Sequence, residues 1–299
     1  MELKNLLIMI SRLIIILLCV VLSSCGKMNR EKIVDKTELT GDDYRLFQGT
    51  PVWELAKAVW DEDVSRIDKI VSKNKQLINF QEPIFGRTLL ILTISNQQYK
   101  SFEALIEQRA DISIHDTYSG TSALIEACSF KQYEIKFVEL LLESGANVND
   151  IETGERKEWN TTRFTPLIAA AKTGMLDLVE LLIRNGADIN YQNEYKHSAL
   201  SESIMVSRYE IALYLLKEGA DYKQPIFFKE EQNRDMYLVD VLREDFFDLD
   251  TDKYKYKMGI VDFLKSKSIN YKATPIPEYI KKKAQENYPD NWQEYLEKY

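Results

Sequence analysis

The sequence predicts an all-α solenoid of about five to six helix-turn-helix units, with hairpin loops between them and a C-terminal helical cap. Two short signals recur in one register along the chain, and the first is a Ser/Thr-x-Leu triplet that begins a helix. The triplets are Thr88-Leu89-Leu90, Ser122-Ala123-Leu124, Thr165-Pro166-Leu167 and Ser198-Ala199-Leu200. They begin 34, 43 and 33 residues apart, which indicates one structural unit repeated along the chain.

The clearest copy begins at Thr165, and its residues predict a pair of short antiparallel helices. Thr165 can cap a helix whose first turn accepts Pro166, because the N–H that proline lacks has no partner there. Ala169 to Ala171 keep that helix thin, and Gly174 permits a tight reversal. Leucines spaced three and four residues apart give the second helix one apolar face, and Gly186 ends it. Such a short pair cannot bury its own apolar face, so stacking of similar units must create the core.

The second signal ends each unit. Its copies are Ala110-Asp111-Ile112, Gly145-Ala146-Asn147, Gly186-Ala187-Asp188 and Gly219-Ala220-Asp221. Together the two signals closely resemble the ankyrin repeat, and the resemblance covers residues 51–270. The family pattern usually places a histidine after the triplet. This chain carries Ile91, Ile125, Ile168 and Ser201 at those positions. The change removes a hydrogen-bond relay between loops and leaves the fold prediction intact.

We divide the chain into four segments. Residues 1–24 are a lipoprotein signal peptide, and residues 25–48 are a polar tether of mixed charge. Residues 49–272 are the repeat domain, with degenerate first and last units. Residues 273–299 form the cap, in which we expect two short helices, the second started by Asp290, to lay an aromatic face over the last repeat.

Residues 1–24 carry the features of a secretion signal, with positive charge near the start and an apolar run from Leu13 to Leu22. Leu22-Ser23-Ser24-Cys25 resembles the lipobox of bacterial lipoproteins, in which the cysteine is acylated and becomes the first residue of the mature chain. An ordinary cleaved signal and an uncleaved anchor helix are the alternatives. Gly26 is not the aspartate that often marks inner-membrane retention, so we expect an outer-membrane lipoprotein that faces the periplasm, held by lipid on Cys25.

The composition argues against several kinds of function. A net charge of −8 disfavours nucleic acid as a partner. Cys128 is expected to be a buried structural thiol, and His115 and His197 are expected to have local loop or capping roles. The sequence contains no phosphate-binding Gly-rich loop, Cys-x-x-Cys, His-Glu-x-x-His or Gly-x-Ser-x-Gly pattern. We therefore predict no catalytic residue, no metal site and no cofactor.

A binding surface remains as the predicted function. In ankyrin-like solenoids the hairpin tips and first helices line a concave face that grips other proteins, and aromatic side chains often dominate such interfaces. The candidate partner-binding residues are Tyr118, Trp159, Phe164, Tyr191 and Tyr195. The loop from Asp150 to Phe164 accounts for most of the longest step and surrounds its tryptophan with charges. A plausible alternative is that Trp159 folds back onto its own repeat.

The resemblance also implies a class of partner. Some exported bacterial ankyrin proteins are immunity proteins that neutralise an envelope-targeting toxin, including lipases delivered by type VI secretion. The first hypothesis is therefore a lipid-anchored protein that binds a protein partner in the bacterial envelope, with a secreted toxin as the sharper version. The alternative is a structural scaffold or stress-protection lipoprotein that supports an envelope enzyme.

Overall fold

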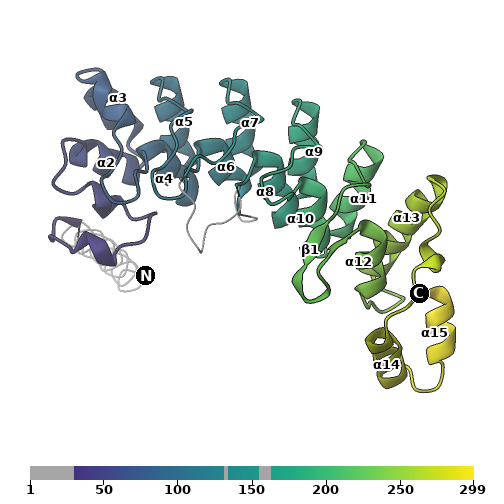
Figure 1. The fold of residues 1–299 in the computed structure, drawn as a ribbon. Helices are drawn as coiled ribbons and strands as arrows, with labels where there is room; N and C mark the ends of the chain where they lie inside the picture. Colours follow the sequence, from purple (N-terminus) through teal and green to yellow (C-terminus); the bar gives the residue numbers. More distant parts are fainter. Residues whose placement is uncertain (1–29, 131–133, 155–162) are drawn as a thin grey trace, which may run out of the picture.

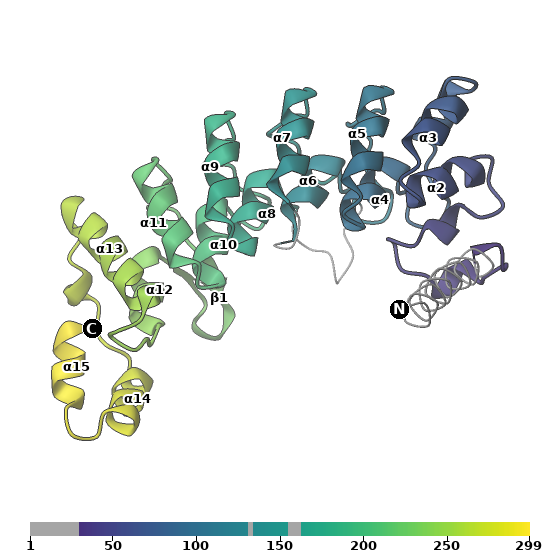
Figure 2. The same ribbon diagram turned by 180° about the vertical axis from the view of Figure 1, so that it is seen from behind.

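The computed structural model describes residues 30–130, 134–154 and 163–299, which form two rows of helices stacked into an arch (Figures 1 and 2). The inner row contains α2 (Trp53–Trp60), α4 (Leu89–Ser95), α6 (Ala123–Cys128), α8 (Pro166–Thr173), α10 (Ala199–Met205) and α12 (Leu238–Glu244). The outer row contains α3 (Val64–Val71), α5 (Tyr99–Glu107), α7 (Ile135–Glu143), α9 (Leu176–Arg184), α11 (Tyr209–Lys217) and α13 (Asp252–Ser266). From α2 to α10, each inner helix packs against the next inner helix and against the outer helix of its own pair. The predicted all-α solenoid is confirmed.

The repeated triplets cap the inner helices as the sequence indicates. The side-chain oxygens of Thr88, Ser122 and Thr165 accept the backbone N–H three residues on, at 3.3, 3.4 and 3.2 Å. In the fourth copy Ser198 accepts the Ser201 N–H at 3.1 Å, and the Ser201 hydroxyl accepts the Ser198 N–H at 2.7 Å. This reciprocal capping box occupies the position of the missing histidine and satisfies two backbone donors locally.

Asparagine side chains tie successive repeats together at the ends of the outer helices. The amide oxygens of Asn79, Asn149 and Asn190 accept the N–H of Asp111, Asp188 and Asp221 in the next repeat, at 2.8, 2.7 and 2.8 Å. Ser113 stands at the equivalent place in the second repeat and is too short for this bond. The connection between the second and third repeats is made elsewhere, as described below.

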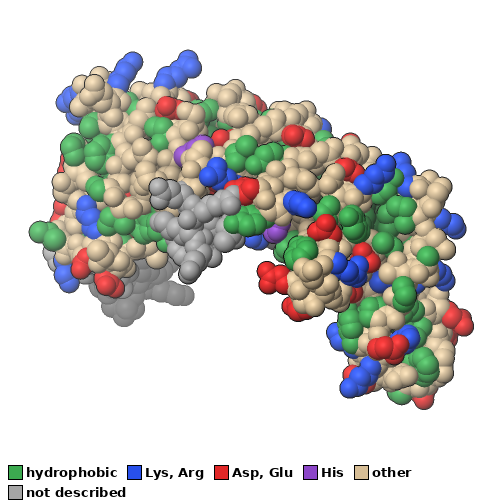
Figure 3. All heavy atoms as spheres, viewed as in Figure 1, with side chains coloured by type: hydrophobic (Ala, Val, Ile, Leu, Met, Phe, Trp, Pro, Cys, Tyr) green, Lys and Arg blue, Asp and Glu red, His purple; other side chains and the backbone are tan. Residues whose placement is uncertain are grey.

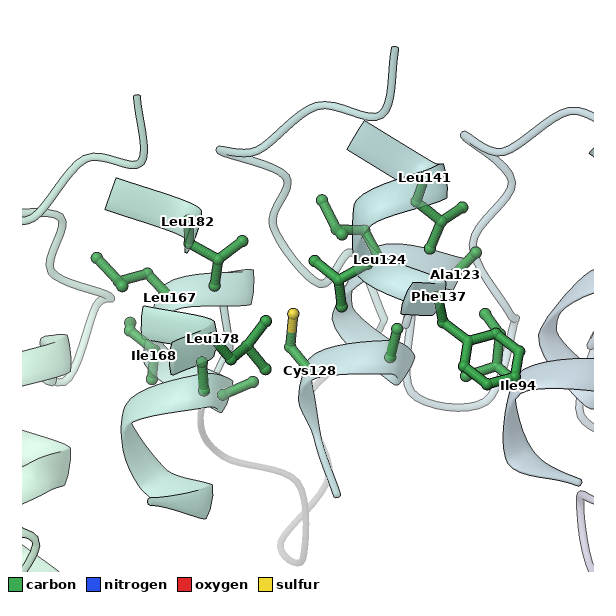
Figure 4. Close-up of a cluster of buried hydrophobic side chains, with 14 of the residues drawn as sticks. Ile94, Ala123, Leu124, Cys128, Phe137, Leu141, Leu167, Ile168, Leu178 and Leu182 are labelled. Carbon is green, nitrogen blue, oxygen red and sulfur yellow. The ribbon is translucent and has the colours of Figure 1, made fainter. Parts of the chain in front are cut away.

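One apolar core runs through the stack, and Cys128 lies in its middle. Figure 4 shows the Cys128 sulfur between α6 and the apolar side chains of the following repeat, near Leu167 and Leu178. Cys128 is fully buried, and burial raises the pKa of its thiol, as expected for a structural cysteine. Aromatic rings continue the contact in the other direction, with the centroids of Phe102 and Phe137 4.9 Å apart.

The second half of the predicted tether is folded, so the 25–48 boundary is wrong for this part. Short 3-10 helices occupy Lys36–Glu38 and Tyr44–Phe47, and the side chains of Tyr44, Leu46 and Phe47 are buried. The Tyr44 ring stacks on Trp60 at a centroid distance of 5.6 Å. These three residues stand in a largely polar stretch without helical periodicity, and they cover the end of the first repeat, where no earlier repeat protects the core.

A β hairpin replaces the usual loop between α11 and α12. Its strands β1 (Phe227–Lys229) and β2 (Arg234–Met236) are antiparallel, with Phe227 opposite Met236 and Phe228 opposite Asp235. The short 3-10 helix Glu230–Gln232 joins the strands. Met236 is fully buried, so the hairpin is anchored to the core while its tip projects from the same side as the other hairpins (Figure 1).

The C-terminal cap contains the two expected helices, α14 (Glu278–Asn287) and α15 (Trp292–Lys298). The Tyr295 ring lies 4.9 Å from the rings of both Tyr288 and Phe246, so aromatic side chains do join the cap to the last repeat. The N-cap of α15 is Asn291 and not Asp290, and no side chain caps that helix.

The predicted signal peptide (residues 1–24) and Cys25 lie outside the described residues. Across the ranges that the structure describes, no helix is both long and apolar enough to cross a membrane.

Candidate protein-binding surface

One buried side chain holds each hairpin tip in place. The residues at this shared position are Glu82, Asp116, Glu152 and Asn193. Asp116 is the clearest case, because its Oδ1 accepts the N–H of Tyr118, Ser119 and Gly120 at 3.0, 2.7 and 3.0 Å. Since buried backbone donors need partners, the carboxylate fixes the path of the tip and the direction in which Tyr118 projects.

Glu152 performs this role at the base of the long third hairpin. Its Oε2 accepts the Phe164 N–H at 3.0 Å, and its Oε1 accepts the Thr121 hydroxyl at 3.1 Å. Burial raises the pKa of Glu152 and outweighs the opposite effect of these two hydrogen bonds. The two ends of the loop are therefore pinned, although residues 155–162, which include the candidate Trp159, lie outside the described residues.

Two side chains tie neighbouring tips to one another. The Gln81 amide donates to the carbonyl oxygens of Gly86 and His115, at 2.7 and 2.9 Å. The His115 ring then reaches the third repeat, with Nδ1 2.9 Å from the Thr153 hydroxyl and Nε2 2.9 Å from the Asp150 carboxylate. His115 lies in a loop as expected, but its role is not local, because its ring makes the connection to the third repeat that Ser113 does not make.

Two of the candidate aromatic residues are exposed at hairpin tips. The side chains of Tyr118 and Tyr195 are 42% and 45% exposed. The Tyr118 ring packs edge-on against Phe85 at 5.2 Å, so its orientation is restricted before any partner arrives. Restricted aromatic side chains offer contact area at a low entropic cost.

The other described candidates are less accessible. Phe164 is half-buried, and the Lys172 ammonium lies 4.6 Å from the centre of its ring. Tyr191 is half-buried and packs against the core. Both residues lie on the proposed surface, but much of each side chain stabilises the repeat itself.

Several further apolar side chains are exposed. Ile84 and Phe228 lie on hairpin tips, Tyr237 precedes α12, and Phe130 and Met205 lie at the ends of α6 and α10. Their exposed fractions range from 38% to 54%. Apolar exposure gathered on one side of a solenoid indicates an interaction surface.

The charges on this side are mixed. Arg87 lies 3.4 Å from Glu126 of the next inner helix and 3.7 Å from Asp116, and the Ser95 hydroxyl donates to Glu126 at 2.6 Å. Figure 3 shows acidic, basic and hydrophobic side chains interspersed along the inner side of the arch. A partner that binds here therefore contacts both positive and negative side chains, and not a surface of one charge.

The described residues do not assemble reactive groups. In the ranges that the structure covers, no cluster of His, Cys, Asp and Glu side chains could hold a metal ion. His197 Nδ1 lies 2.6 Å from Glu202 on the helix that follows it, α10, which is the local role expected from the sequence.

Two ionisable groups with strongly perturbed pKa values lie under the C-terminal cap. The Lys257 ammonium is 3.6 Å from the centre of the Tyr299 ring and donates to the main-chain oxygen of Asp245 at 2.9 Å. Burial lowers the pKa of Lys257 to about 7 and raises that of Asp245 to about 6. Lys257 has no exposed surface, so its side chain packs within the cap.

Comparison with known proteins identifies the repeats. The family model described as ankyrin repeats (3 copies) matches residues 55–152 and 150–225. A putative ankyrin repeat protein of Acanthamoeba polyphaga mimivirus is 36% identical over 91 residues, which are 29% of this chain and 54% of that protein. The mouse B-cell lymphoma 3 protein homolog is 32% identical over 136 residues, which are 45% of this chain and 27% of that protein. The chain thus spans about half the length of the first relative and less of the second.

Proposed function

Because the chain belongs to the ankyrin repeat family, whose repeats generally mediate protein–protein interaction, we propose that it captures a protein partner without catalysis. The partner lies on the surface formed by the hairpin tips and the ends of the inner helices. The observation that carries this proposal is the gathering of exposed aromatic and aliphatic side chains there, with Tyr118, Tyr195 and Phe228 at three different tips. Hydrogen bonds to Asp116, hydrogen bonds to Asn193 and the β1–β2 pairing hold these three tips in fixed conformations, which reduces the entropy lost on binding.

The site of action that we propose is the bacterial envelope, with the protein held at the outer membrane by lipid on Cys25. The support is the sequence Leu22-Ser23-Ser24-Cys25 after an apolar run. Replacing Cys25 with Ala should move the protein from the membrane fraction to the soluble fraction of its native cells. A Cys25→Ala protein that still sediments with membranes and still functions would contradict the lipid anchor.

The partner that we favour is a toxin that attacks the envelope, which makes this an immunity protein. Deletion of the gene should make cells sensitive to the toxin of a neighbouring gene, and restoring the wild-type chain should remove that sensitivity. The alternative, an envelope scaffold or stress-protection lipoprotein, predicts a housekeeping enzyme as the partner. It is supported if the partner copurifies from unstressed cells and deletion changes no toxin sensitivity.

The binding surface itself is tested with paired variants. Tyr118→Ala with Tyr195→Ala should reduce partner capture at least tenfold, since aromatic hot-spot residues each contribute about 1 kcal/mol or more. Helical circular dichroism should be unchanged, because both side chains are exposed. Tyr191 is a poor choice for this test, since it packs against the core. Full capture by the double variant would show that the partner binds elsewhere.

A further inference from the structure

A small pocket lies between two neighbouring hairpins on the proposed surface. It has a volume of about 220 Å³ and is bounded by the tip before α10 and by the β1–β2 hairpin. Its lining includes Glu194, Tyr195, Lys196, Phe227, Phe228 and Asp235. Figure 3 shows hydrophobic and acidic side chains side by side at this hairpin.

Backbone hydrogen bonds fix the positions of the residues that form the aromatic walls of the pocket. Asn193 Oδ1 accepts the Tyr195 N–H at 3.0 Å and the His197 N–H at 2.9 Å, which fixes the first wall. Phe228 is 54% exposed and stands opposite Asp235 in the β ladder. Directly opposed residues of an antiparallel pair project from the same face, so this ring and this carboxylate belong to one wall. Phe227, half-buried against the core, adds a further ring.

One carboxylate beside the aromatic rings, that of Asp235, favours a cation in the pocket. Glu194 lies 3.4 Å from Arg163, so its charge is partly balanced. No described side chain forms a hydrogen bond or an ion pair with the Asp235 carboxylate. Lys196 is the opposing charge at the rim, and it too forms no ion pair within the described ranges. Aromatic rings beside a carboxylate without a counter-ion attract a cation through both the ring quadrupole and the charge.

We propose that this pocket binds the guanidinium group of an arginine side chain presented by the partner. The inference rests on the proposed function for the source of the arginine, and it adds the chemistry that the partner must offer. A planar guanidinium stacks on the rings of Tyr195 or Phe228 while its N–H groups donate to Asp235. The aliphatic part of the side chain covers the remaining apolar wall.

Lys196 allows a test of whether positive charge at the rim of the pocket opposes binding. Its φ of +64° is in the left-handed region, and the equivalent tip residues Gly86 and Gly120 have φ of +70° and +74°. Glycine at position 196 therefore fits the backbone without strain. The Lys196→Gly variant removes the side chain whose charge opposes a bound cation, so it should bind arginine more tightly than the wild type.

The experiment titrates the isotopically labelled protein with N-acetyl-arginine amide and follows its backbone amide resonances by NMR. The neutral isostere N-acetyl-citrulline amide is the control ligand. We expect saturable shifts at Tyr195 and Phe228 with the arginine compound only. Binding should weaken about threefold in Asp235→Asn and strengthen about threefold in Lys196→Gly, as expected for a single exposed charge contact.

A second pair of variants separates ring stacking from charge. Phe228→Leu keeps an apolar wall but removes the ring, so it should weaken binding of the arginine compound. Tyr279→Leu removes an exposed ring on helix α14, in the C-terminal cap, and should leave binding unchanged. Equal shifts with the citrulline compound, or weaker binding in Lys196→Gly, would overturn the proposal. The titration uses no protein partner, so it tests the pocket independently of the proposed function. If the protein binds the arginine compound but captures no protein partner, only the proposed function is contradicted.

Discussion

Replacement of Asp116 tests whether buried side chains hold the hairpin tips. In Asp116→Ala, the N–H groups of Tyr118, Ser119 and Gly120 lose their acceptor. The Asp116 side chain has no exposed surface, so water cannot replace it without rearrangement of the tip. At a net value of about 1 kcal/mol for each hydrogen bond, we expect the free energy of unfolding to fall by about 3 kcal/mol. Asp116→Asn keeps Oδ1 and should lose about 1 kcal/mol.

The assay is urea unfolding followed by far-UV circular dichroism, with Asp111→Ala as the matched control. Asp111 also accepts from a backbone N–H, that of Ser113 at 2.9 Å, but it lies in an exposed part of the same repeat. That control should change the free energy of unfolding by less than about 1 kcal/mol, as surface replacements usually do. The reasoning is refuted if Asp116→Ala and Asp111→Ala lose the same free energy.

Three further predictions concern stability and are measured in the same way. Ser207→Gly should raise the free energy of unfolding by about 1 kcal/mol, because Ser207 has a φ of +56° at the inter-helix turn where Gly174 has +85°. An unchanged free energy of unfolding would contradict a strained turn. Asn149→Ala should lose about 2 kcal/mol, since Asn149 bonds both the N–H of Asp188 at 2.7 Å and the oxygen of Gly186 at 3.1 Å; an unchanged midpoint would show that this tie is weak. The pKa of Lys257 is lowered to about 7 in the folded protein. Above pH 7 this lysine is therefore protonated in the unfolded chain but not in the folded one, so the free energy of unfolding of the wild type should rise from pH 7 to 9. Lys257→Met should abolish that rise, and a slope that persists would assign it to another group.

The repeat architecture could be predicted because its signals are local. An N-cap such as Thr165 and a C-terminal glycine such as Gly186 act within one helix, so the sequence shows them directly. Recurrence of the same signals then fixed the stacking, since a single pair of helices cannot form a core. The packing of Tyr44 on Trp60 is different, because it depends on which surface the first repeat leaves open. No local pattern in residues 36–48 carries that information.

The candidate surface could be predicted only in part for the same reason. Aromatic residues on tips are visible in the sequence, but their exposure depends on neighbouring repeats. Tyr195 is open to solvent, whereas Tyr191, four positions earlier, packs against the core. The pocket beside Phe228 needs the β ladder that places this ring next to Asp235. His115 likewise gained its role from Asp150 in the following repeat.

The central claim is that a protein partner binds the hairpin-tip side of the arch. The most direct measurement is site-specific photo-crosslinking in native cells, with a benzoylphenylalanine residue placed at Tyr195, at Phe228 or at Glu143. Tyr195 and Phe228 lie on the tips, and Glu143 is exposed at the end of the outer helix α7. We predict one crosslinked protein from both tip positions and none from Glu143. Crosslinks from Glu143 alone, to the same protein, would contradict the claim.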